Sequence, residues 1–173
     1  MSKKTSLRDF QQYLADRLKS AATGRGTSSL LGVRAGRENW LLDLSDSGEI
    51  VQMPPLTHVP LTNKAFAGIA NIRGSLYAVT DFSVFRGGDS TALNANARLV
   101  LIGTKHGSNA ALLVSRMQGL RTAEQFELIA NAPDAPAWVS GTYRDTHGDT
   151  WQKIAVRQLL ADETFMNIGI SQQ

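Results

Sequence analysis

The feature that most limits the fold is a long succession of short strand-like segments that begins near Trp40. Polar turns that contain glycine, such as "SDSG", "TKHGSN" and "THGD", separate these segments from one another. The predicted strands cover 39–44, 48–53, 75–81, 98–103, 109–116, 117–122, 138–143 and 150–156. Short strands at this spacing are typical of an all-β barrel or sandwich, and they argue against a doubly wound α/β sheet.

Three helices are predicted around these strands. Short helices are expected over 82–86, capped by Asp81 or Thr80, and over 156–167. An amphipathic helix is expected over 6–22, where apolar residues recur at three- and four-residue steps. The apolar residues of this stripe are Leu7, Phe10, Leu14, Leu18 and Ala21. The helix either docks on the protein's own core or is offered to a partner protein.

A weak internal repeat indicates two lobes. Gly68 aligns with Gly141 at an offset of 73 residues, and Gly74 aligns with Gly148 at an offset of 74. Both segments have the same order of elements: aromatic residue, glycine, strand, glycine turn, strand and short helix. A shared order of this kind is expected for a duplicated structural unit. The sequence therefore predicts an N-terminal helical extension and linker over 1–30, followed by two pseudo-repeated lobes over 31–173.

Charge and composition narrow the classes of function. Residues 1–40 carry a net charge of +5, whereas residues 41–173 carry −2, so the basic excess belongs to the extension. A folded nucleic-acid binder usually shows a basic patch with aromatic residues between the charges, and none is expected here. No apolar run is long enough to span a membrane and the first residues do not resemble a secretory signal, so we expect a cytoplasmic protein without direct membrane insertion.

No residue constellation indicates catalysis. The three histidines, His58, His106 and His147, are scattered along the chain, and cysteine is absent. The carboxylates Asp43, Asp46 and Glu49 fall in one strand-turn-strand stretch and are interpreted as turn and rim charges. No nucleophile elbow, dinucleotide motif or pair of catalytic carboxylates is present. We therefore expect no enzyme activity, no cofactor and no bound metal.

The stretch from 48 to 87 resembles the CheW-like domain of bacterial chemotaxis adaptors. The matching positions are Glu49-Ile50, Val59-Pro60, Phe66, the run "GIANIRG" from Gly68 to Gly74, and Asp81-Phe82. The likeness extends over about 38–165. It departs from the family pattern at Ala78, where a proline is often found, and around Asn63-Lys64, where a second proline is usual.

The resemblance implies a mainly β fold of two SH3-like five-stranded β-barrel lobes packed together. It also implies a non-catalytic adaptor that couples a methyl-accepting chemoreceptor to the regulatory domain of a CheA-like histidine kinase. The "MPPLTHVP" loop, the "ANIRG" run and the N-terminal helix are most similar to the pilus-associated branch, which serves type IV pilus twitching motility.

Site residues for receptor and kinase interaction follow from the same resemblance. They are Glu49, Ile50, Ile72, Arg73, Gly74 and Asp81. The family's arginine at the position of Arg73 pairs with a glutamate, here Glu49, near a receptor-facing groove. Two alternatives stay open: a CheW-like inhibitor that sequesters the kinase, and an SH3-like barrel that binds a small ligand or nucleic acid.

Overall fold

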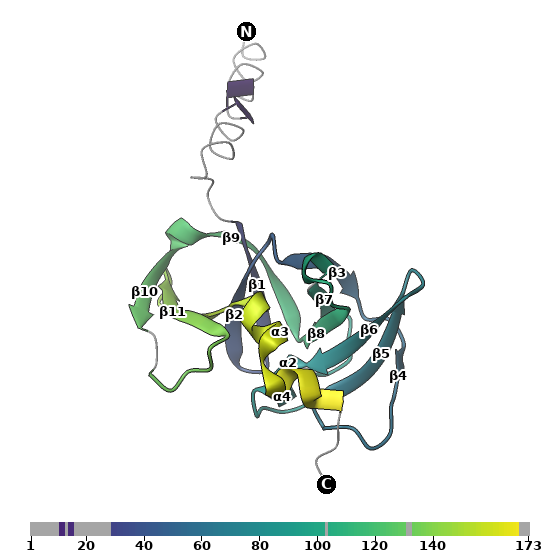
Figure 1. Ribbon diagram of the computed structural model, residues 1–173. Coiled ribbons are helices and arrows are strands. Elements are labelled where there is room, and N and C mark those ends of the chain that lie inside the picture. The colour runs from purple at the N-terminus through teal and green to yellow at the C-terminus, as the bar shows by residue number, and fades with distance from the viewer. Residues whose placement is uncertain (1–10, 13, 16–28, 103, 131–132, 170–173) are drawn as a thin grey trace.

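The computed structural model describes residues 11–12, 14–15, 29–102, 104–130 and 133–169, and about half of them lie in strands (Figure 1). The strands are β1 (Ser29–Ala35), β2 (Glu38–Asp43), β3 (Ser47–Gln52), β4 (Leu56–Thr57), β5 (Phe66–Ile72), β6 (Ser75–Asp81), β7 (Arg98–Ile102), β8 (Ala110–Val114), β9 (Arg116–Thr122), β10 (Phe126–Ala130), β11 (Val139–Asp145) and β12 (Thr150–Ile154). The α-helices are α2 (Phe82–Phe85), α3 (Val156–Ala161) and α4 (Glu163–Met166), and the 3-10 turns are η1 (Thr104–His106), η2 (Ala123–Gln125) and η3 (Asn167–Gly169).

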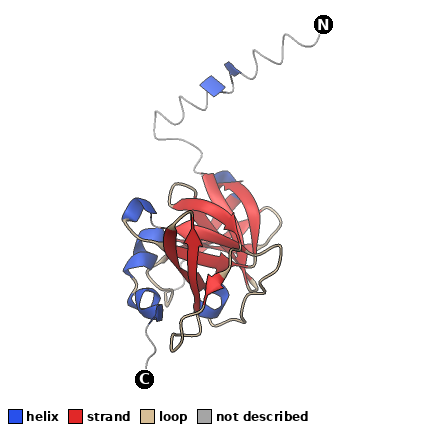
Figure 2. Ribbon diagram, turned by 90° about the vertical axis from the view of Figure 1, so that its right-hand side faces the viewer, coloured by secondary structure: helices blue, strands red, loops and turns tan. Residues whose placement is uncertain are grey.

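The described strands form two mixed sheets of six strands each. Sheet A has the order β10-β11-β12-β2-β1-β9, and sheet B has the order β3-β7-β8-β6-β5-β4. Each sheet contains one parallel pair, β12 with β2 and β6 with β8, among antiparallel neighbours. Figure 2 shows the strands as a continuous block, with the helices gathered around it.

The two edge strands of each sheet are consecutive in sequence. Three residues join β3 to β4 in sheet B, and three residues join β9 to β10 in sheet A. Such short connections require each sheet to curl until its edges approach, yet no described strand pairing closes it. Each sheet has six strands where five per lobe were expected. The number becomes five only if β3 and β4, or β9 and β10, are counted as one bent strand.

The largest hydrophobic core lies between the sheets. Trp40 and Leu42 of β2 meet Val100 of β7 and Leu112 of β8 there, together with Phe82 of α2. Alternate residues of the same strands point the other way, because successive side chains of a strand lie on opposite faces. Two smaller cores result, one inside the curl of sheet B around Leu99, Leu113 and Val79, and one inside sheet A around Leu30, Leu41 and Trp151.

Both halves of the predicted repeat form a hairpin followed by a helix. Strands β5 and β6 precede α2, and β11 and β12 precede α3. The register of each hairpin shifts at its first glycine, between Phe66 and Gly68 and between Val139 and Gly141. The second strand of each hairpin then enters the parallel pair of its sheet.

Several element boundaries differ from the sequence prediction. Strands β1, β4 and β10 were not expected, β5 was expected only from the internal repeat, and β1 begins at Ser29, within the predicted linker. Gly32 interrupts the apolar pattern of β1, but the ring of Trp151 packs where its side chain would stand, 3.2 Å from the position of a Cβ. The single helix predicted over 156–167 is broken at Asp162, which ends α3 and caps α4 through Phe165 N–H.

The helix predicted over 6–22 lies mostly outside the described residues. Gln11, Gln12, Leu14 and Ala15 are described, and they are helical and exposed. None of the helices among the described ranges has the length and apolar character needed to cross a bilayer.

Candidate interaction site

A bidentate ion pair between Arg73 and Glu49 joins two distant parts of sheet B. Arg73 lies in the turn between β5 and β6, and Glu49 lies in the edge strand β3. Nη1 of Arg73 is 2.6 Å from Oε2 of Glu49, and Nη2 is 2.5 Å from Oε1. Because β3 and β5 stand near opposite edges of the sheet, the pair links the two sides of the curl by side chains alone.

The turn that carries Arg73 is a two-residue hairpin loop, with Ile72 opposite Ser75. Both loop residues have positive φ, +52° at Arg73 and +87° at Gly74, as a type I′ turn requires. The side chain of Asn71 accepts a hydrogen bond from Gly74 N–H at 2.9 Å and so supports the turn. Glycine is suited to this conformation, whereas arginine pays about 1–2 kcal/mol for it.

The ion pair between Arg73 and Glu49 contributes little to the stability of the fold. The side chains of Arg73 and Glu49 are 75% and 41% exposed, so the ion pair lies in solvent. A pair in water contributes about 0–1 kcal/mol to stability, which does not exceed the strain of the turn. The structure therefore holds an arginine at positive φ with its guanidinium in solvent, and the ion pair does not offset the strain of the turn.

The other residues predicted near Arg73 and Glu49 differ in how far they are exposed. Ile50 is half-buried against the central core, and Ile72 is half-buried against the core of sheet B. Gly74 is exposed in the turn. Leu76, which the sequence analysis did not select, is 58% exposed two residues beyond the turn. Its outward position follows from the strand alternation with Tyr77, which faces the core.

Asp81 does not lie on this surface. It is 5% exposed, and Oδ1 accepts hydrogen bonds from Ser83 N–H at 3.1 Å and from the hydroxyl of Thr91 at 2.7 Å. Oδ2 accepts a third hydrogen bond from Thr91 N–H at 2.8 Å. The carboxylate thus caps α2 and fastens the loop that follows it, so a direct contact of Asp81 with a partner is not favoured by its position.

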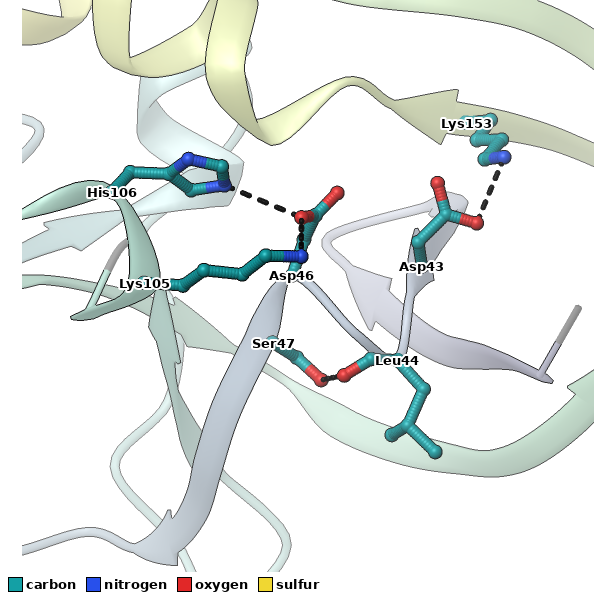
Figure 3. A network of polar contacts seen from close by, with 7 residues as sticks. All are labelled: Asp43, Leu44, Asp46, Ser47, Lys105, His106 and Lys153. Atoms are coloured by element: carbon teal, nitrogen blue, oxygen red, sulfur yellow. Dashed lines mark hydrogen bonds and ion pairs between the residues drawn. The ribbon is translucent and has the colours of Figure 1, made fainter. Parts of the chain in front are cut away.

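The turn between β2 and β3 carries the chain from sheet A to sheet B, and ion pairs join it to β12 of sheet A and to η1 (Figure 3). Asp43 lies 3.0 Å from Nζ of Lys153 in β12. Asp46 lies 3.7 Å from Nζ of Lys105 and 3.3 Å from Nε2 of His106, both in η1. The three carboxylates interpreted as turn and rim charges therefore each have a cationic or histidine partner on another element.

The histidines do not assemble a catalytic or metal site. His106 is better enclosed than expected for a solvated turn, at 16% side-chain exposure, whereas His58 and His147 are exposed. Within the described ranges no three histidine or acidic side chains gather closely enough to hold a metal ion.

One carboxylate has a shifted pKa for structural reasons. Burial acts to raise the pKa of Asp145, but hydrogen bonds to the carboxylate outweigh it and leave the pKa below its ordinary value. The donors are Nε1 of Trp151 and the backbone N–H groups of His147 and Asp149, each at 2.9 Å. These bonds close the β11–β12 turn.

Comparisons with known proteins agree with this fold. The model of the CheW-like domain matches residues 29–164. The crystal structure of the scaffolding protein TtCheW from Thermoanaerobacter tengcongensis superposes with a TM-score of 0.62 at 21% sequence identity, over 74% of this chain and 88% of that chain. The search of curated proteins gave no significant match.

Proposed function

Because the chain belongs to the CheW-like domain family, we propose that it is a non-catalytic cytoplasmic adaptor that couples a methyl-accepting chemoreceptor to a CheA-like histidine kinase. The observation that carries this proposal is the presentation of Arg73. A strained turn and a bidentate ion pair hold its guanidinium in solvent, and the exposed Leu76 follows three residues later in the same hairpin.

The proposed receptor-facing surface consists of Glu49, Arg73, Gly74 and Leu76. A guanidinium fork recognises carboxylates and backbone carbonyls with defined geometry, and an adjacent leucine supplies apolar contact area. Receptor segments that offer an acidic group next to apolar side chains would be complementary to it. The kinase contact is expected elsewhere, at an apolar lobe-to-lobe interface, so the two partners would not compete.

We further propose that the protein serves type IV pilus twitching motility. Support comes from the sequence of the "MPPLTHVP" loop, the "ANIRG" run and the predicted N-terminal helix. We also propose that each curled sheet corresponds to an SH3-like lobe in which the two consecutive edge strands act as one bent strand.

The test is co-purification of the full chain with a chemoreceptor cytoplasmic fragment and a kinase regulatory domain, each titrated separately. The wild-type chain is expected to bind both. Arg73→Lys keeps the charge but removes the fork, and Arg73→Ala removes both, so receptor affinity should fall in that order while kinase affinity is kept. Arg144→Ala, at an exposed arginine of β11, is the matched control and should bind both partners normally.

Two results would contradict the proposal. A chain that binds the kinase domain but no receptor fragment would indicate a sequestering inhibitor. Equal loss of both partners in Arg73→Ala, with an altered circular dichroism spectrum, would indicate general misfolding instead of a receptor site.

A further inference from the structure

A polar pocket lies where the β1–β2 hairpin of sheet A meets the end of α2. Its volume is about 490 Å³, which falls within the range of roughly 300–1,000 Å³ that small-molecule sites occupy. The turn 35–38 lines one side, and Ser83 with the segment 86–89 lines the other. The lining shares no residue with the proposed receptor-facing surface, so a ligand in this pocket would be separate from a receptor contact.

The hydroxyl of Ser83 is an unpaired polar group in the lining of this pocket. Ser83 is 2% exposed, and its Oγ has no hydrogen-bond partner among the described residues. Buried hydroxyls nearly always have a partner, because a buried polar group without one lowers stability. An unpaired hydroxyl that lines a pocket therefore points to a bound polar molecule as its partner.

Two glycines flank this hydroxyl and keep the pocket open beside it. A Cβ at Gly36 would stand 2.6 Å from Oγ of Ser83, and a Cβ at Gly88 would stand 2.8 Å from the same atom. Gly36 also has a φ of +58°, which favours glycine. Glycine is the usual residue where a backbone must approach a ligand closely. Side chains at these two positions would displace the hydroxyl or close the pocket over it.

The guanidinium of Arg86 is held in a fixed position in the same lining. Its Nε and Nη2 donate to the carboxylate of Glu38 at 3.2 and 3.4 Å. Its Cζ lies 5.1 Å from the ring centroid of Trp40 and 5.5 Å from that of Trp138. A two-bond ion pair and stacking on two rings restrict an arginine before any ligand arrives. The pocket therefore presents a carboxylate and a guanidinium in a preformed arrangement.

The charges of the lining balance. Besides the ion pair, the lining contains Arg37 and Asp89, which are exposed and form no ion pair with another described residue. Arg34 of the same hairpin does not line the pocket, and its Nε donates to the carbonyl oxygen of Gly36 at 3.2 Å. A phosphate or a polyamine would meet repulsion from one of the two free charges, whereas a molecule with one group of each sign can pair with both.

We propose that this pocket binds a free α-amino acid with an uncharged polar side chain. Arg37 recognises its carboxylate, Asp89 recognises its ammonium group, and the hydroxyl of Ser83 forms a hydrogen bond with its side chain. A zwitterion is the smallest class of ligand that satisfies both free charges and still offers a third polar group to the hydroxyl. This inference does not depend on the proposed adaptor function.

The test titrates the full chain, labelled with nitrogen-15, with L-serine, L-threonine, L-asparagine and L-glutamine at millimolar concentrations. We expect saturable shifts of the amide resonances of Gly36, Gly87 and Gly88 with at least one of them, and no shift at Gly107 or Gly148. The same amino acid with its carboxylate amidated, or with its amino group acetylated, should bind at least about tenfold more weakly. L-alanine, which lacks the polar side chain, should also bind more weakly. No saturable shift with any of the four, or equal binding of inorganic phosphate, would overturn the proposal.

Variants of the lining make the result specific. Arg37→Gln and Asp89→Asn should each raise the dissociation constant about tenfold or more, because each removes one charged contact. Ser83→Ala should weaken binding without lowering the unfolding temperature, because its hydroxyl has no partner to lose within the described chain. Arg144→Gln, at an exposed arginine of β11, is the matched control and should bind as the wild type does. Unchanged affinity in Arg37→Gln and Asp89→Asn would contradict recognition of a zwitterion at this pocket.

Discussion

Arg73 and Glu49 form a two-bond ion pair that bridges the open curl of sheet B, although both side chains remain largely in solvent. Their backbones are not hydrogen-bonded to each other, because three strands separate β3 from β5 in the sheet order. In a closed barrel, backbone hydrogen bonds between the two edge strands join the two sides of the sheet. In sheet B, the side chains of Arg73 and Glu49 join these two sides. The exposure of this ion pair predicts how much it contributes to stability.

Arg73→Ala and Glu49→Ala should each lower the free energy of unfolding by less than about 1 kcal/mol, because exposed ion pairs contribute little. A double-mutant cycle read by urea unfolding measures the coupling, which we expect to be below about 0.5 kcal/mol. A coupling of several kcal/mol would show that the pair is enclosed.

Arg73→Asn should leave the protein as stable as the wild type or stabilise it by up to about 1 kcal/mol, because asparagine tolerates the positive φ of this turn. The same variant should lose receptor affinity if the guanidinium contacts the partner. Thermal unfolding and receptor titration are measured side by side. Stability and affinity that fall together would contradict the interpretation of Arg73 as a strained functional residue.

Asp81→Ala should cost about 2–4 kcal/mol, since it removes the cap of α2 and leaves the buried N–H of Ser83 and the partly buried donors of Thr91 without an acceptor. Asp162→Ala is the matched control. Asp162 caps α4 through one bond to Phe165 N–H, at 3.0 Å, and is less buried, so its loss should cost about 1 kcal/mol. Equal costs in chemical unfolding would mean that Thr91 adds nothing to the role of Asp81.

Gly68→Ala should destabilise the protein strongly, because a Cβ at this position would stand 2.6 Å from the carbonyl oxygen of Thr57 and φ is +136°. Gly148→Ala shares a positive φ, +89°, but its Cβ would meet nothing within 4 Å. We expect about 1 kcal/mol for Gly148→Ala and at least about 2 kcal/mol for Gly68→Ala, measured by thermal unfolding. The reverse order would refute the close approach of β4 to β5.

Asp145 should make the protein sensitive to acid. Its pKa is lowered in the folded state, so its contribution to stability is present above the unfolded pKa of about 3.9 and is lost as the pH falls through the folded value. Asp145→Asn should be less stable than the wild type at neutral pH and should show a flatter loss of stability below about pH 4. Parallel stability curves for the two proteins over that range would contradict this assignment.

The sequence by itself determined the class of the fold and most of its strands. Turn residues and strand alternation predicted β6 at 75–81 correctly, and of the two caps predicted for α2, Asp81 or Thr80, the structure has Asp81, since these are local properties. The family assignment also rested on local motifs around Arg73. Leu76 was accessible to the same reasoning, because alternation with Tyr77 and Val79 places it outward.

Only the tertiary structure decided how these pieces are combined. Strand β1 was not predicted. Gly32 interrupts its apolar pattern, and only the folded chain brings the ring of Trp151, far along the sequence, into that space. The sequence also did not predict that one central core is shared by both sheets, or that Arg73 and Glu49 meet in solvent. Exposure depends on how distant strands curl toward one another, and pairing between distant strands leaves no signal in the spacing of residues along one of them.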